Sequence, residues 1–325
     1  MHGIFKSCSR FALHRMGGLH AFRRLRQRDV RILVYHQFSP DRETLDALER
    51  QCEYVRRYYQ PVTMDEIADG LDRKSLPPRA LAITVDDGYR NYLQGAHSVF
   101  RAYGLPVTVF LISDFLDGKW LWWDKVHYLL MNTGQTRITI PVGAMESSYN
   151  LQVEDRERVA DAIVRKAKGV PNAQRLEMVE KLTEISEVSL PEVPPASMSP
   201  LSWDEVRRLR TEGVSFGAHT KTHPIMARVE TDAELLYELS ASRRRIEQEI
   251  GDTVQHFCYP NGQGTDFDDR SVRAVRECGF RTAVSSIGGG NRIESADRFS
   301  LRRSGVVLPV PDVYFQETVI GLHDR

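Results

Sequence analysis

The sequence of 325 residues has no excess of charge of either sign. It contains 44 lysines and arginines and 44 aspartates and glutamates, so its formal net charge at pH 7 is zero. Proteins that bind nucleic acids through the phosphates usually carry a basic surplus. The balanced charge therefore disfavours a general polyanion-binding function, and we expect no nucleic-acid partner.

Cysteines are few and far apart in the sequence. The four cysteines, at positions 8, 52, 258 and 278, form no C-x-x-C pair. Zinc knuckles and dithiol redox sites need closely spaced cysteines. The spacing argues against both kinds of site, and we expect reduced thiols.

Long apolar runs are also missing. No uninterrupted apolar stretch reaches the 18 residues that a membrane-spanning helix needs. Residues 1–29 hold seven basic residues before the first acid, Asp29, and lack the continuous apolar core of a signal peptide. We expect a basic amphipathic leader, either resting on an anionic membrane surface or docked on the core. The expected location is the cytoplasm or the inner membrane face; the oligomeric state is not predicted.

After this leader, short apolar β-branched runs alternate with helical patterns, which is typical of an α/β fold with a parallel sheet or barrel. The expected strands are residues 31–35, 80–85, 107–112, 214–217, 256–259 and 282–284, and the expected helices include 42–57, 89–103, 233–250 and 268–277. Capping boxes at Thr63 with Glu66 and Ser202 with Glu205 mark two helix starts. We expect a main domain over 30–310, interrupted by a mostly helical insertion at about 116–200, and a C-terminal tail over 311–325.

Two adjacent carboxylates, Asp86 and Asp87, follow directly after the apolar segment Leu81–Val85 and precede Gly88. In parallel α/β folds the carboxyl ends of the strands carry the ligand-binding residues. Adjacent side chains at a strand end project in different directions, so one acid can bind a metal ion while the other faces the reacting water. For an isolated D-D-G, a plain turn is the alternative.

A second polar segment, from Gly217 to Pro224, follows another predicted strand and contains His219 and His223. Four-residue spacing predicts two imidazoles on one side of a helical turn, as a metal chelate requires. One carboxylate and two neutral imidazoles suit zinc or a similar divalent ion and leave positions open for water and substrate. A lone H-x-x-x-H motif more often consists of surface histidines without a metal. Its position after a predicted strand, together with the acid pair after an earlier strand, favours metal binding.

Together with a third segment, Phe257–Pro260, these motifs resemble those of the polysaccharide deacetylases, the carbohydrate esterase family that shares the NodB homology domain. The acid pair resembles the family's T-F-D-D-G motif, with Val85 replacing the phenylalanine, and His219–Pro224 matches H-[ST]-x-x-H-P. The resemblance spans roughly residues 32–307 without the insertion. It implies a distorted (β/α) barrel of about seven strands and a carbohydrate substrate.

The resemblance also implies roles for individual residues. Asp86 would be the general base, and Asp87, His219 and His223 would hold a divalent metal, with zinc expected and cobalt, nickel or manganese as alternatives. The third motif implies substrate contacts at Tyr259 and Pro260, with the Tyr259 backbone N–H helping to bind the oxyanion.

No counterpart of the family's late L-x-x-H motif is evident, so the general acid must come from elsewhere. Val34-Tyr35-His36 resembles the Y-H near the start of exopolysaccharide deacetylases, and we nominate His36, against the alternative of a packed rim histidine. Arg302 and Arg303, near the last predicted strand, either orient Asp86, contact substrate or are solvated. The insertion also contains three tryptophans, Trp120, Trp122 and Trp123. They either stack on sugar rings or pack inside the insertion, and we nominate Trp122 and Trp123 as substrate contacts.

The resulting hypothesis is a metal-dependent hydrolase that removes the acetyl group from N-acetylhexosamine units of a bacterial-type surface polysaccharide or its lipid-linked precursor. One alternative is an enzyme that acts on a small glycoside or another amide. A second alternative is a catalytically weak sugar-binding module on the same barrel.

Overall fold

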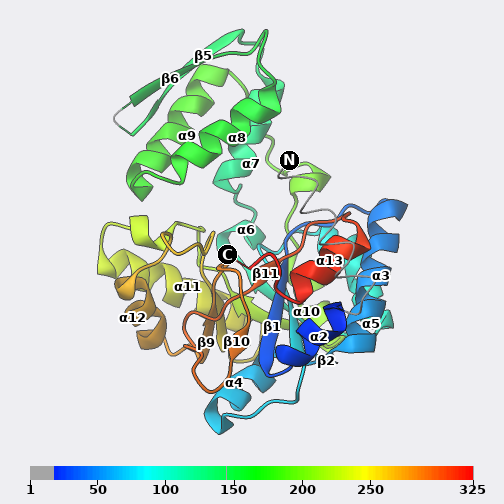
Figure 1. Ribbon diagram of the computed structural model, residues 1–325. Helices are drawn as coiled ribbons and strands as arrows, with labels where there is room; N and C mark the ends of the chain where they lie inside the picture. The colour runs from blue at the N-terminus through cyan, green and yellow to red at the C-terminus, as the bar shows by residue number, and fades with distance from the viewer. Residues whose placement is uncertain (1–17, 144, 325) are drawn as a thin grey trace, which may run out of the picture.

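A curled, mainly parallel sheet forms the centre of the protein (Figure 1). The computed structural model describes residues 18–143 and 145–324, so residues 1–17 of the expected leader lie outside the described part. The strand order is β10-β1-β3-β4-β7-β8-β9, with β2 paired to β3 and β11 paired to β1. These strands are β1 (Asp29–Tyr35), β2 (Gln60–Pro61), β3 (Ala80–Val85), β4 (Val107–Leu111), β7 (Ser215–Ala218), β8 (His256–Cys258), β9 (Thr282–Val284), β10 (Asn291–Arg292) and β11 (Ser304–Gly305).

The chain segment 301–306 joins the two ends of this sheet. Leu301 donates its backbone N–H to the carbonyl of Ala283 in β9, and Val306 donates its N–H to the carbonyl of Val34 in β1. β11 also pairs in parallel with β1. The segment thus connects β9, the last strand in the order, with β1, which lies next to the other end, and the sheet curls into a distorted barrel; this confirms the predicted α/β barrel class.

Helices cover the outside of the barrel. They are α3 (Arg42–Tyr58), α4 (Met64–Arg73), η1 (Tyr92–Ala96), α5 (His97–Ala102), α6 (Ser113–Leu116), α10 (Trp203–Thr211), η3 (Met226–Arg228), α11 (Asp232–Ile250) and α12 (Asp269–Glu277). Both predicted capping boxes are present, at the starts of α4 and α10. The helix expected at 89–103 begins three residues later with a π-helical turn, because Tyr89 still pairs as a bridge with Pro200.

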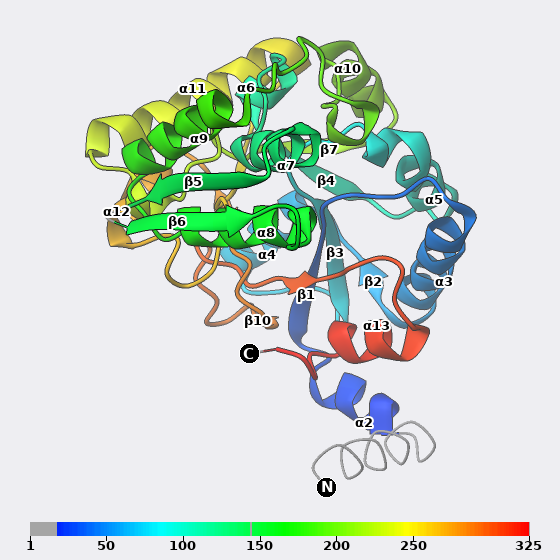
Figure 2. The ribbon, with the colours of Figure 1, turned by 90° about the horizontal axis from the view of Figure 1, so that it is seen from above.

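The predicted insertion lies as a separate layer on one end of the barrel (Figures 1 and 2). It contains α7 (Trp122–Asn132), β5 (Arg137–Val142), β6 (Met145–Asn150), α8 (Arg156–Ala167), α9 (Asn172–Ser186) and the short η2 (Ala196–Met198). These helices and the antiparallel β5-β6 hairpin enclose a hydrophobic core of their own. The expectation of a mostly helical insertion missed this hairpin. Ile138 and Ile140 point inward on either side of Thr139, a period-two pattern that marks a half-buried strand.

The two ends of the described chain meet beside β1. The C-terminal helix α13 (Asp312–Val319) packs against α3, and Asp324 forms an ion pair of 2.8 Å with buried Arg31. The N-terminal helix α2 (Gly18–Leu25) buries Leu19 and leaves Leu25 exposed. Among residues 18–143 and 145–324, no helix combines the length and apolarity needed to cross a bilayer. Membrane contact by the leader stays a prediction.

Candidate active site

The acid pair lies where β3 leaves the sheet. All six residues of β3 are buried, and the two carboxylates that follow are buried as well. Asp87 has a left-handed backbone with φ of 72°, which non-glycine residues rarely adopt, and Gly88 continues at 87°. This turn separates the two side chains, because Asp86 faces the inside of the barrel while Asp87 faces the histidine loop.

The histidine loop follows β7, and it is not the helical turn that the spacing predicted. Thr220 and His223 both have left-handed backbones, with φ of 62° and 57°. Glu238 of α11 accepts the backbone N–H groups of Lys221 and Thr222, which holds the loop in this shape. The loop nevertheless brings the imidazoles of His219 and His223 together, with ring centroids 4.7 Å apart.

Asp87, His219 and His223 form a compact ligand set. The Oδ1 atom of Asp87 lies 3.5 Å from Nε2 of His219 and 3.8 Å from Nε2 of His223. His219 donates Nδ1–H to the backbone carbonyl of Cys258 at 2.7 Å, so its Nε2 atom points into the cluster. One carboxylate oxygen and two imidazole nitrogens within 4.8 Å of one another are the donor set of a divalent ion such as zinc.

The two histidines of the ligand set have pKa values shifted in opposite directions. Burial lowers the pKa of His223, and the neighbouring cations of His219, Arg175 and Lys168 lower it further. Burial also acts to lower the pKa of His219, but Cys258 and the Asp87 carboxylate outweigh it and raise that pKa. A neutral His223 is the form that a metal ligand requires.

The second carboxylate, Asp86, is paired with a buried arginine. Arg303 donates Nη1–H to Oδ1 and Nη2–H to Oδ2 of Asp86, at 2.8 and 2.7 Å. Burial acts to raise the pKa of Asp86, but the Arg303 charge and its two hydrogen bonds outweigh it and hold that pKa below its ordinary value. Asp86 is therefore ionised at neutral pH and ready to accept a proton.

The two adjacent arginines differ sharply in environment. Arg303 has a side-chain exposure of 0%, whereas Arg302 is exposed and donates to the carbonyl of Gly288. A solvated Arg303 was one expectation, and it is wrong, because neighbouring residues of an extended chain point to opposite sides. Arg303 lies behind Asp86 and does not line the cavity described below, so the geometry matches its orienting role rather than substrate contact.

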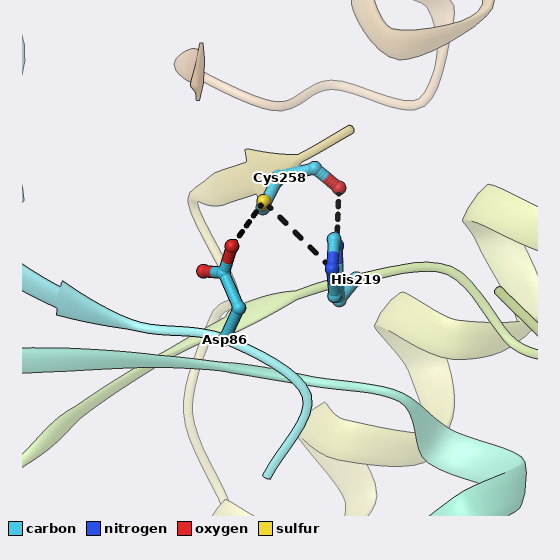
Figure 3. Close-up of side chains that lie close together, drawn as sticks. All are labelled: Asp86, His219 and Cys258. Carbon is cyan, nitrogen blue, oxygen red and sulfur yellow. Dashed lines mark hydrogen bonds between the residues drawn. The ribbon is translucent and has the colours of Figure 1, made fainter. Parts of the chain in front are cut away.

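Cys258 joins the base to the metal cluster, and sequence reasoning did not single it out. Figure 3 shows its thiol directed at Asp86 and its carbonyl directed at His219. Its Sγ atom lies 3.4 Å from Oδ2 of Asp86 and 3.0 Å from Nη2 of Arg303. The sequence indicated only that Cys258 lies in a predicted strand and that its side chain points to the opposite side of the sheet from Phe257.

A cavity of about 440 Å³ opens onto both the base and the ligand set, and two parts of the chain line it. The barrel wall consists of Val34, His36, Asp86, Asp87, His219, His223, Ile225, Asn261, Gln263, Ser286 and Gly305. The inserted wall consists of Trp122, Trp123, His127, Val164 and Lys168. Lys168 connects the two walls, since its Nζ donates to Oδ1 of Asn261 at 2.7 Å, and burial lowers its pKa.

The nominated general acid and two of the three tryptophans lie at this cavity. His36 has a half-exposed side chain, and its Nε2 lies 3.8 Å from Oδ2 of Asp86. Trp122 and Trp123 line the inserted wall, whereas Trp120 donates to the carbonyl of Pro191 within the insertion.

The third motif is arranged differently from its expected role. The backbone N–H of Tyr259 donates to the carbonyl of Val284 at 3.1 Å, because the pairing of β8 with β9 extends to this residue. Its ring is buried, and its hydroxyl donates to Phe299. Neither Tyr259 nor Pro260 lines the cavity, so the expected oxyanion contact at this N–H is wrong for this structure.

Comparisons with known proteins agree with this architecture. The chain is 30% identical over 94 residues to YxkH of Bacillus subtilis (strain 168), assigned to the polysaccharide deacetylases; the match spans 27% of this chain and 33% of that protein. The fold resembles that of the deacetylase PplD of Streptococcus pyogenes, with a TM-score of 0.59, 13% identity and coverage of 90% and 98% of the two chains.

Two further solved structures share the fold. A de-N-acetylase from Aggregatibacter actinomycetemcomitans has a TM-score of 0.57 at 18% identity, with 89% of this chain and 99% of that chain covered. IcaB from Ammonifex degensii has a TM-score of 0.55 at 16% identity, with 90% and 97% covered. The family model for polysaccharide deacetylases matches residues 73–283, more than half of the chain. The resemblance inferred from the motifs is thereby confirmed, and the chain belongs to the polysaccharide deacetylase family.

Proposed function

We propose that this chain is a metal-dependent hydrolase that removes the acetyl group from N-acetylhexosamine units of a bacterial-type surface polysaccharide or its lipid-linked precursor. One observation carries the proposal. A buried, ionised carboxylate, Asp86, lies beside a carboxylate-and-imidazole ligand set at the same cavity. That combination is what metal-assisted hydrolysis of an amide requires.

Asp87, His219 and His223 would hold the ion, with zinc as the best fit to this donor set and cobalt, nickel or manganese as alternatives. When bound, the ion supplies Lewis-acid polarisation of the acetamide carbonyl and a lowered pKa for water. The chain's own contribution is to fix the orientation of the His219 ring, with Nε2 directed inward, through the bond from Nδ1 to the Cys258 carbonyl.

Asp86 is the proposed general base. It accepts a proton from the attacking water, and Arg303 keeps it ionised and fixed in orientation. His36 is the proposed general acid, because its imidazole lies at the cavity and near Asp86. From there it can donate a proton to the departing amine nitrogen, which must be protonated to leave.

The inserted wall is the proposed sugar-contacting surface. Trp122 and Trp123 both line the cavity, and indole rings pack well against the apolar C–H faces of a pyranose. Trp122 is mostly buried in the core of the insertion, so Trp123 is the more exposed of the two rings. Among the structures that share this fold, PplD was determined in complex with acetate, the acid that deacetylation releases. A small glycoside or another amide is the alternative substrate. A purely sugar-binding module is disfavoured, because binding alone needs no buried, arginine-paired carboxylate beside a ligand set.

Acetate release from N-acetylglucosamine oligomers, measured with and without a chelator, tests this function. We expect release by the metal-loaded protein, complete loss after chelation, and recovery on adding back a divalent ion. Release that survives complete metal removal would contradict the mechanism. Oligomer binding without any acetate release at saturating metal would favour the sugar-binding alternative.

A further inference from the structure

The two imidazoles of the ligand set are held in different ways. The Nδ1 atom of His219 donates to a barrel carbonyl, which fixes the orientation of the ring. The Nδ1 atom of His223 is buried and has no hydrogen-bond partner among the described residues. A metal-binding histidine usually relies on a partner at its second nitrogen for its orientation. Something other than a hydrogen bond must therefore fix the ring of His223.

An aromatic contact from the insertion supplies this support. The indole of Trp123 lies against the His223 ring, with centroids 4.6 Å apart and planes at 65°. This is the edge-to-face geometry that aromatic pairs prefer. The imidazole of His219, itself a member of the ligand set, is the other ring that lies against His223 among the described residues. Trp123 is thus the one aromatic residue outside the ligand set that contacts His223 within the described part of the chain.

Trp123 is itself fixed to the barrel. Its Nε1–H donates to the hydroxyl oxygen of Tyr89 at 3.0 Å, and the Tyr89 hydroxyl donates to Asp124 at 2.8 Å. Tyr89 is buried, lies two residues after Asp87 and packs edge-on against Phe115. The indole is therefore held by the same chain segment that supplies the carboxylate ligand.

A second contact from the insertion reaches the backbone of the same histidine. Arg175 of α9 is buried, lies over the Trp122 ring at 4.9 Å and donates to the His223 carbonyl at 3.5 Å. Because His223 has a left-handed backbone, the loop gains from support at this residue. The insertion thus contacts both the ring and the backbone of one metal ligand.

We propose that Trp123 is a positioning residue for His223, so that the insertion determines metal affinity as well as the shape of the cavity. This inference rests on the proposed assignment of Asp87, His219 and His223 as metal ligands. Trp123 also lines the cavity, so a role confined to sugar stacking is the competing explanation. The two explanations differ in the absence of substrate, since only a positioning role changes metal binding there.

The test is the dissociation constant for Zn²⁺, measured on the purified full chain without substrate by competition with a chromophoric chelator. We expect Trp123→Ala to weaken binding by about 10- to 100-fold, the range typical of residues that orient metal ligands. Trp123→Phe keeps an aromatic edge against His223 and should bind more tightly than Trp123→Ala. Tyr89→Phe removes the hydroxyl that accepts the hydrogen bond of the indole. Its Zn²⁺ affinity should lie between those of Trp123→Phe and the wild type.

Trp120→Ala is the matched control, because Trp120 belongs to the same insertion but lies away from the cavity. Its Zn²⁺ affinity should equal that of the wild type. The absorption spectrum of the Co²⁺-loaded protein gives a second readout, since it reports ligand geometry; we expect it to change in Trp123→Ala and not in Trp120→Ala. If Trp123→Ala fails to fold by circular dichroism, the Trp123→Phe and Tyr89→Phe variants decide the question.

Unchanged Zn²⁺ affinity and Co²⁺ spectra in folded Trp123 and Tyr89 variants would overturn the positioning role and leave the proposed function standing. A wild-type protein that binds no divalent ion would overturn both. Restoration of Trp123→Ala turnover by excess Zn²⁺ would support the inference, because a lost sugar contact is not restored by metal.

Discussion

The barrel wall and the inserted wall of the cavity differ in chemistry and in origin. The barrel wall holds the proposed base, the proposed acid and all three proposed metal ligands, and these residues follow strand ends. The inserted wall offers mainly tryptophan and valine surface, with His127 and Lys168 as its polar members. This difference suggests that the barrel carries out the reaction, while the insertion selects the substrate and supports one ligand. Substitutions on the two walls should therefore change different kinetic constants.

On the barrel side, a large effect on both stability and turnover is expected for Arg303→Met. Removing the guanidinium leaves the Asp86 charge buried and unpaired, which typically costs about 3 to 5 kcal/mol of stability. The carboxyl would then take up a proton, and kcat should fall about 10³-fold, within the range that a general base contributes. Urea unfolding and acetate release measure the two effects. Arg302→Met is the matched control, and an equal loss in both variants would argue against the pairing.

His36→Gln tests the other proposed proton-transfer residue. Glutamine keeps a hydrogen-bonding side chain but cannot donate a proton to the leaving amine, so kcat should fall about 10²-fold with little change in KM. The stability should change little, since the His36 side chain is half exposed. Turnover near the wild-type level would move the acid role to another residue.

The inserted wall should respond through KM. Trp122→Ala removes the part of the ring that lines the cavity and should raise KM about 10-fold with a smaller change in kcat. Because most of the ring is buried in the core of the insertion, the variant should also lose about 3 to 5 kcal/mol of stability. Steady-state kinetics on N-acetylglucosamine oligomers of fixed length provide the measurement. A fall in kcat at unchanged KM would contradict the division of labour between the walls.

The smallest effect on turnover is expected for Asp124→Asn. Asp124 belongs to the insertion and accepts a hydrogen bond from Tyr89 of the barrel. Burial raises the pKa of Asp124 to about 7, with the Asp87 charge adding to the rise and the Tyr89 hydrogen bond opposing it. The folded pKa exceeds the unfolded value, so this stability contribution is present below about pH 4 and is lost as the pH rises to about 7.

The loss should be on the order of a few kcal/mol at most. In metal-free protein, the difference in free energy of unfolding between Asp124→Asn and the wild type should grow in favour of the variant from about pH 4.5 to about pH 7.5. Urea unfolding at the two pH values measures this difference. Parallel pH dependence in the two proteins would show that Asp124 does not titrate in this range.

The barrel half of the site could be predicted from sequence because its signals are local. β3 is a continuous apolar segment followed directly by Asp86 and Asp87, and a polar histidine segment follows β7 in the same way. Parallel strands bring such carboxyl ends together. The four-residue histidine spacing predicted that the two imidazoles lie together, and they do. The predicted helical turn is wrong, since the loop turns through left-handed residues.

The remaining features depend on contacts between distant parts of the chain. Asp86 and Arg303 are 217 residues apart, so the sequence offered their pairing only as one of three roles for the two arginines and could not choose among them. The contact of Trp123 with His223 requires the insertion to fold back over the barrel. The β5-β6 hairpin was missed although Ile138 and Ile140 alternate with Thr139, because the surrounding segment is dominated by charged helical patterns.

The most direct test of the account is to measure bound metal and acetate release in the same preparations of Asp86→Asn and His223→Ala. The account predicts that Asp86→Asn retains the wild-type metal content and loses turnover by about 10³- to 10⁴-fold, because Asp86 is the base and not a ligand. It predicts that His223→Ala loses both metal and turnover. Equal metal loss in the two variants would contradict the assignment of separate roles to the acid pair and the histidine loop.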